Sequence, residues 1–212
     1  MPLHLQEYVI GDMANNTYLL ADTETNQALL IDPAMGISQI MPEIKTNGWQ
    51  ISEILLTHAH FDHTYGIYEL QDNLPTLPPI ALHTRDQTLY NSGGLGELMG
   101  LHRAPLPAIS HWLKDEETIQ LGNYPISVRH CPGHTQGHVL FYAPDLQSAF
   151  VGDCIFRRSI GRTDLPGGSH EELIHTIKEK IFTLPKETRL LSGHGASTTV
   201  EEEMQGNPFL ID

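Results

Sequence analysis

Thr57-His58-Ala59-His60-Phe61-Asp62-His63 follows directly on the apolar run Ile54-Leu55-Leu56. The stretch contains histidine and aspartate, which are both residue types that bind divalent metals. A helix cannot direct alternate residues such as His58 and His60 to one point, because residues two apart do not share a face. A strand end or a tight loop can, because alternate residues lie on the same side. The pattern H-x-H-x-D-H therefore predicts a metal-binding loop at the carboxyl end of a buried strand.

A chance origin is the alternative interpretation of this stretch. The chain has 13 histidines, so a single H-x-H pair could arise without any function. Three histidines and an aspartate in one short window are much harder to explain in that way. We therefore interpret the window as half of a metal site whose remaining ligands must come from elsewhere in the chain.

Three later segments repeat the arrangement of an apolar run, a turn and a potential ligand. His134 follows a Pro-Gly turn, Asp153 follows an apolar run that ends in glycine, and His194 lies between two glycines. Each has a structural alternative, namely a turn residue for His134, a cap for Asp153 and a plain glycine loop for His194. If these strand ends lie at one edge, the ligands that converge are His58, His60, Asp62, His63, His134, Asp153 and His194.

Seven ligands exceed the three or four protein groups that one tetrahedral zinc ion takes. They suit two ions, one with His58, His60 and His134, the other with Asp62, His63 and His194, and Asp153 as the bridge. Two divalent cations about 3.5–4 Å apart are a hydrolytic arrangement, since they activate a water and stabilise the oxyanion that forms. We expect zinc, while imidazole and carboxylate ligands also suit iron or manganese.

Length and charge narrow the class of protein. A chain of 212 residues with 40 % hydrophobic content suits a single globular domain over residues 1–212. The net charge of −14 argues against nucleic-acid partners and against attachment to anionic membranes, since both need clustered Lys and Arg. No stretch is long and apolar enough to span a bilayer, and the N-terminus has no signal-peptide pattern. The two cysteines, Cys131 and Cys154, are expected to be reduced packing residues in a cytoplasmic protein.

Hydrophobic periodicity predicts strands that alternate with helices. The predicted strands are residues 17–21, 28–31, 51–56, 80–83, 118–121, 124–129, 138–142, 149–151 and 189–191. The predicted helices are residues 37–47, 66–74 and 85–90, and one that begins at Ser169, where Glu172 completes a capping-box pattern. This order indicates two packed sheets with helices outside. Short turns predict two hairpins in the second half, residues 118–121 with 124–129 and residues 138–142 with 149–151, whereas the remaining strand pairing does not follow from the sequence.

The segment Asn91–Ala108 has no clear periodicity and holds four glycines, two prolines and two apolar clusters. Long irregular segments inside compact domains are often lids or binding loops. A solvent-exposed connector is the alternative, and the sequence favours neither.

The motifs resemble those of the metallo-β-lactamase superfamily and, within it, of glyoxalase II (hydroxyacylglutathione hydrolase) and its short single-domain bacterial relatives. The matching stretches are residues 57–63, 131–135 with Gly137-His138, 152–153, 161–164, 193–195 and the ending 207–210. The resemblance implies an α/β fold, the αββα sandwich of two mixed β-sheets with helices outside and the metals at one edge. It also implies hydrolysis of S-2-hydroxyacylglutathione thioesters, typically S-lactoylglutathione.

Two departures from glyoxalase II bear on the substrate. Glyoxalase II carries a C-terminal helical domain that helps to bind glutathione, whereas residues 195–212 alone follow the last ligand here. The loop after Asp153 also differs, and it offers Arg157, Arg158 and Arg162 to an anionic thiol carrier. Simple surface positions are the alternative for these arginines, and for Arg162 we favour a structural pair with Asp164.

The predicted reaction is attack of a metal-bridging hydroxide on the carbonyl of a small, glutathione-derived thioester, with Asp62 orienting the nucleophile. A thiol with a pKa near about 8.5 leaves readily. One alternative is a persulfide dioxygenase, which shares the fold and the G-R-T-D run but uses one iron held by residues matching His58, His134 and Asp153. Another is a lactonase of the same superfamily. A non-enzymatic metal-binding protein is disfavoured by the open glycine-rich turns.

Overall fold

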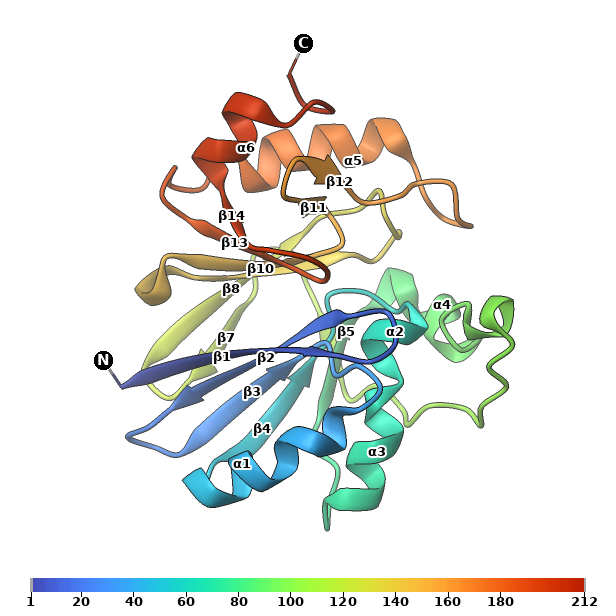
Figure 1. Ribbon diagram of the computed structural model, residues 1–212, viewed down its shortest axis with the longest axis vertical. Helices are drawn as coiled ribbons and strands as arrows, with labels where there is room; N and C mark the ends of the chain where they lie inside the picture. The colour runs from blue at the N-terminus through green and yellow to red at the C-terminus, as the bar shows by residue number, and fades with distance from the viewer. Residues whose placement is uncertain (1, 212) are drawn as a thin grey trace.

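The computed structural model describes residues 2–211, and its strands form two six-stranded sheets that pack face to face (Figure 1). The first sheet contains, in spatial order, β1 (Leu3–Ile10), β2 (Asn15–Asp22), β3 (Gln27–Ile31), β4 (Gln50–Leu55), β5 (Ile80–His83) and β6 (His111–Leu113). The second contains β14 (Thr198–Thr199), β13 (Arg189–Ser192), β10 (Ser148–Gly152), β9 (Val139–Ala143), β8 (Tyr124–His130) and β7 (Thr118–Leu121). A small hairpin of β11 (Ile155–Phe156) and β12 (Ser159–Ile160) stands apart from both.

Both sheets are mixed, and their parallel pairs position the functional loops. In the first sheet β3, β4, β5 and β6 run parallel, whereas β1, β2 and β3 pair antiparallel. In the second sheet β10 and β13 run parallel and the remaining neighbours are antiparallel. Parallel neighbours end at the same edge of a sheet, so the loops after β4, β10 and β13 emerge at shared edges.

Helices cover the outer faces of both sheets, so the layers are ordered α-β-β-α (Figure 1). The first sheet carries the 3-10 helix η1 (Ile37–Ile40), α1 (Met41–Asn47) and α3 (Gly66–Asn73), and the second carries α5 (His170–Thr176), its π-helical continuation η5 (Ile177–Ile181) and α6 (Val200–Gly206). Shorter helices are α2 (Phe61–Thr64), η2 (Thr84–Asp86), α4 (Gln87–Asn91), η3 (Gly96–Met99) and η4 (Pro144–Leu146). The predicted αββα fold class is therefore confirmed.

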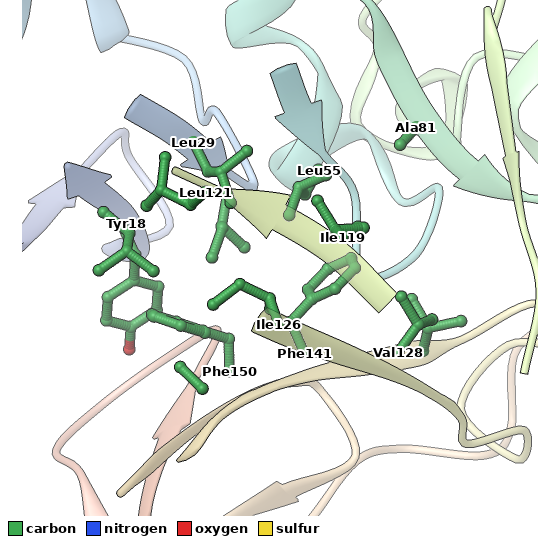
Figure 2. Close-up of a cluster of buried hydrophobic side chains, with 14 of the residues drawn as sticks. Tyr18, Leu29, Leu55, Ala81, Ile119, Leu121, Ile126, Val128, Phe141 and Phe150 are labelled. Carbon is green, nitrogen blue, oxygen red and sulfur yellow. The ribbon is translucent and has the colours of Figure 1, made fainter. Parts of the chain in front are cut away.

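The core has one layer between the sheets and one beneath each group of helices. Figure 2 shows the middle layer, where Tyr18 and Leu29 of the first sheet meet Phe141 and Phe150 of the second. Side chains alternate along a strand, so Leu19 and its neighbours on the opposite face pack under α1 and α3 instead. This burial on both faces explains why the strand sequences read as almost continuous apolar runs.

Most predicted elements are confirmed, together with both predicted hairpins of the second sheet. Gly48 ends α1 with φ 71, and the Ser169 hydroxyl accepts the Glu172 N–H at the start of α5. The prediction omitted β1, β6, β11, β12, β14 and α6. It described the metal-binding stretch as a loop although α2 lies in it, and it left Asn91–Ala108 without regular structure although η3 lies inside it. Over residues 2–211, none of the helices has the length and apolarity needed to cross a membrane. The cytoplasmic location and the single domain over residues 1–212 stay predictions.

Candidate metal centre

Four segments bring all the predicted ligands to one edge of the sandwich. His58 and His60 lie in the loop after β4, and Asp62 and His63 lie in α2, which that loop leads into. Of the other three, His134 follows β8, Asp153 follows β10 and His194 follows β13. The strand ends that the sequence analysis expected to meet are therefore together.

His58, His60 and His134 form the first group of potential ligands. One ligand atom from each lies within 4.8 Å of the others, and His60 Nδ1 is 2.9 Å from His134 Nε2. All three side chains are buried. Three converging imidazoles without a carboxylate among them have little reason to pack together unless a cation lies between their nitrogens.

Asp62, His63 and His194 form the second group, again with ligand atoms within 4.8 Å of one another. His194 Nε2 lies 3.3 Å from Asp62 Oδ2, and His63 Nε2 lies 3.6 Å from the same oxygen. Asp153 lies between the groups, because its Oδ2 is 3.7 Å from both His134 Nε2 and His194 Nε2. Its Oδ1 is 3.5 Å from His63 Nε2.

The unpaired atoms of this cluster fit a metal ion. Buried polar atoms are normally hydrogen-bonded. Four atoms here are buried and have no hydrogen-bond partner, namely His58 Nε2, His60 Nε2, His63 Nε2 and Asp153 Oδ1. A coordinated cation would satisfy these atoms, since their lone pairs have no hydrogen-bond donor. Imidazole together with carboxylate suits zinc, iron or manganese.

The charge states of His60 and Asp62 suit metal binding. Burial, together with the neighbouring imidazole of His134, lowers the pKa of His60 to about 3. The pKa of Asp62 falls to about 2, because His63 and the donors from His194 and Asn15 outweigh the effect of burial. Neutral imidazole and ionised carboxylate are the forms that bind metals. At His63 and His194 the carboxylates of Asp62 and Asp153 outweigh burial and raise the pKa, so these two imidazoles would release a proton when an ion binds.

Asp32 holds the loop that carries the ligands. Its Oδ1 accepts the Thr57 N–H at 2.7 Å, and its Oδ2 lies 2.6 Å from Thr57 Oγ1 and 3.0 Å from His63 Nδ1. This directs the other ring nitrogen of His63 into the centre. Asp32, His58 and His63 also lie close enough to form a third group, but Asp32 already uses both oxygens on Thr57 and His63.

Backbone oxygens and Asn15 orient further ligands. His134 Nδ1 lies 2.8 Å from the Arg162 carbonyl oxygen, and His194 Nδ1 lies 3.2 Å from that of Met13. Asn15 Nδ2 donates to Asp62 Oδ2 at 3.0 Å. The roles of Asn15 and Asp32 were not predicted from the sequence. Asp32 follows an apolar strand directly, which is the signal that identified the other strand-end ligands.

Asp86 ties the two halves of the centre together, and its role was not predicted from the sequence either. Its carboxylate accepts the Ala59 N–H at 3.0 Å, the Thr135 hydroxyl at 2.8 Å and the Gly137 N–H at 2.6 Å. Burial raises the pKa of Asp86 despite these donors. The loop carrying His58 and His60 is thus fixed to the loop carrying His134.

A cavity of about 370 Å³ opens over the cluster. His60, Asp62, His134, Asp153 and His194 line it together with apolar side chains. We call five of these apolar residues the apolar rim: Met13, Leu95, Leu98, Met99 and Leu165. Three of the five come from the Asn91–Ala108 segment, so its first half belongs to the site. Its second half packs Leu106 against the core.

The three predicted substrate-binding arginines lie in different surroundings. Arg162 lines the cavity, and its guanidinium donates twice to Asp164, at 2.8 Å in both bonds, which is the favoured structural pair. Arg158 instead lies against Gly206 at the end of α6. Arg157 is exposed and is absent from the cavity lining, as is Arg158. The structure therefore does not bring the three arginines together at the mouth.

Both cysteines are buried and free, and Cys154 Sγ donates to the carbonyl oxygen of Cys131 at 3.3 Å. Burial raises the pKa of the Cys154 thiol well above its usual value. A buried thiol that stays protonated is a poor nucleophile and a poor metal ligand.

The sequence model of the metallo-beta-lactamase superfamily matches residues 10–194, so the chain belongs to that superfamily. The Bacillus subtilis (strain 168) protein named "Probable metallo-hydrolase YqgX" is 36% identical over 204 residues, which cover 95% of this chain and 94% of that protein. "Hydroxyacylglutathione hydrolase GloC" of Haemophilus influenzae is 32% identical over 197 residues, covering 92% of each.

Two solved structures share the whole architecture. The crystal structure of BLEG-1 B3 metallo-beta-lactamase has a TM-score of 0.88 and 34% sequence identity, covering 99% of this chain and 100% of that one. The structure of TTHA1623 in a di-iron-bound form has a TM-score of 0.86 and 36% identity, covering 97% of this chain and 100% of that one. Relatives of similar length thus have different named activities, and similarity alone does not identify the substrate.

Proposed function

We propose that this protein is a two-metal hydrolase of thioesters, with S-2-hydroxyacylglutathiones such as S-lactoylglutathione as substrates. The observation that carries the proposal is the cluster of seven potential ligands, whose buried and unpaired atoms converge at the floor of an open cavity. The named activity of the relative GloC supports the choice of substrate. We propose zinc as the metal, with iron as the alternative because TTHA1623 was solved with two irons.

Two divalent ions in this position would lower the pKa of a water and polarise the substrate carbonyl. His58, His60 and His134 would hold one ion and Asp62, His63 and His194 the other, with Asp153 touching both. Asn15 fixes Asp62, whose carboxylate would help to hold the ion and could accept a hydrogen bond from a water bound there. The thiolate would leave without help from a general acid, because a thiol with a pKa of about 8.5 is an adequate leaving group in its ionised form.

A histidine substitution tests this proposal. His60→Ala removes a ligand, and His170→Ala removes an exposed histidine at the start of α5. We expect His60→Ala to lose metal and at least about 100-fold in S-lactoylglutathione turnover, since a ligand and its ion act as a unit. His170→Ala should match the wild type in both. Normal turnover by folded His60→Ala protein would contradict the proposal.

The rival activities need their own substrates. Oxygen uptake with glutathione persulfide, together with a single iron, would identify a dioxygenase. Faster turnover of an acyl-homoserine lactone than of any thioester would identify a lactonase. We expect the thioester to be preferred, because the second group of ligands provides a place for a second ion and the relative GloC is named for the hydrolysis of a glutathione thioester.

A further inference from the structure

Three side chains of the apolar rim are far more exposed to solvent than large apolar side chains usually are. Leu98 is 70% exposed, Met99 61% and Met13 43%, although each lines the cavity above the metal cluster. The three side chains come from two segments far apart in sequence, the β1–β2 turn and η3. Large apolar side chains left in water beside a functional cavity are a common mark of a ligand-binding surface.

The backbone holds this rim in place. Phe61 N–H donates to the Gly94 carbonyl at 2.9 Å, which joins the rim segment to the metal-binding loop. A side chain at Gly94 would lie 2.4 Å from the Ala59 carbonyl oxygen, so the two segments are in close contact. Leu95 has φ 66, a strained conformation for leucine. Strained backbone of this kind recurs where a structure holds a ligand clamp in position.

Lysine and arginine are scarce on the cavity wall. Among the described residues that line the cavity, Arg162 is the sole Lys or Arg, and Asp164 occupies its guanidinium. A carboxylate pressed against Leu98 and Met99 would lose its hydration and gain no partner. The charged thiol carrier therefore has no reason to lie on the rim, whereas an apolar acyl group does.

We propose that the apolar rim binds the acyl group of the substrate and makes the enzyme prefer thioesters with longer apolar acyl chains. This inference rests on the proposed thioesterase function and refines it. The carrier then extends toward solvent past Arg162. Met13, Leu98 and Met99 act as specificity-determining residues, because they contact the part of the substrate beyond the reacting carbonyl.

The acyl preference is measured as a ratio of kcat/KM values for two glutathione thioesters. S-(2-hydroxyhexanoyl)glutathione has three more methylenes than S-lactoylglutathione, and burial of each methylene favours binding about fourfold. Because the rim is open on one side, we expect a total preference of about tenfold rather than the full product. A wild-type ratio near one would overturn the inference.

Serine substitutions locate the preference. The double variant Leu98→Ser with Met99→Ser, and separately Met13→Ser, should reduce the ratio to near one while the metal content stays at the wild-type level. Met204→Ser is the matched control, since Met204 is 40% exposed but lies on α6 outside the cavity. The wild-type ratio in both rim variants would overturn the inference.

Binding of unreactive thioethers keeps the two proposals distinguishable. S-hexylglutathione should bind the metal-loaded wild-type protein at least about tenfold more tightly than S-methylglutathione by calorimetry, and the rim variants should lose that difference. This comparison does not depend on turnover. If no thioester is hydrolysed, the proposed function is wrong. If the two thioethers bind equally, or if neither binds, the inference that the apolar rim binds the acyl group is wrong.

Discussion

At the scale of single residues, Asp32 shows how one carboxylate can organise a centre to which it contributes no ligand. Its backbone has φ 49, a region that Asp and Asn tolerate better than other residues with a side chain. Both oxygens are used, one on the Thr57 N–H and the other on Thr57 Oγ1 and His63 Nδ1. The tautomer of His63, and with it the direction of its free Nε2, therefore depends on Asp32.

Asp32→Asn should weaken metal binding by about 10- to 100-fold, because the amide offers one acceptor oxygen where the carboxylate offers two. Asparagine keeps the shape and the backbone preference, so the fold should persist. Competition with a chromogenic chelator measures the affinity. Asp72→Asn, at an exposed position on α3, is the control and should bind as the wild type does. Wild-type affinity in Asp32→Asn would show that His63 does not need this partner.

At the scale of elements, α6 fastens the hairpin that follows Asp153. Glu203 is fully buried, and its carboxylate accepts the Thr198 hydroxyl, the Arg158 N–H and the Asn207 amide. Asn207 also donates to the Ser159 carbonyl at 2.9 Å. Helix α6 and the residue after it thus bond to the turn of the β11–β12 hairpin and to the first residue of β12. This hairpin directly follows the predicted bridging ligand Asp153.

Glu203→Ala should reduce the free energy of unfolding by about 3 kcal/mol, because it leaves buried donors without an acceptor. Glu201→Ala removes an exposed glutamate from the same first turn and should cost less than about 0.5 kcal/mol. Urea unfolding followed by circular dichroism gives both values. Equal midpoints for the two variants would mean that the buried network does not stabilise α6.

At the scale of the whole molecule, His111 on β6 connects the first sheet to the start of β7 in the second sheet. Its Nδ1 lies 2.7 Å from Glu53 Oε1 on β4, and its Nε2 lies 2.8 Å from Glu117 Oε1 beside β7. Burial alone would lower the pKa of His111, but the two glutamates outweigh it and raise the pKa. Protonated His111 thus links elements of both sheets.

This link predicts a pH dependence of stability. A raised folded-state pKa stabilises the protein fully below the unfolded value of about 6.5, and the stabilisation is lost as the pH rises through the folded-state pKa. His111→Gln should therefore be destabilised most at about pH 6 and least at about pH 9. Urea midpoints across this range, relative to His170→Ala, test the expectation. A constant difference between variant and wild type would contradict it.

The sequence predicted what depends on local pattern. Apolar runs that end at glycine or histidine identified the strands and the predicted ligands, and Ser169 with Glu172 identified a helix start. Strand pairing beyond the hairpins did not follow, because it depends on contacts between segments distant in the chain. Asn15 and Asp86 were missed because single polar residues carry no spacing signal, whereas Asp32 was missed although it directly follows an apolar strand. Helix α6 was missed although Thr199 and Glu202 repeat the capping pattern.

Stepwise metal loading of the stripped protein tests the two-metal claim most directly. Zinc would be added in measured amounts per chain, with bound zinc and S-lactoylglutathione hydrolysis recorded at each step. The two groups of ligands predict binding of two ions per chain, with most turnover appearing only as the second ion binds. Full turnover with one ion per chain, or with none, would contradict the account.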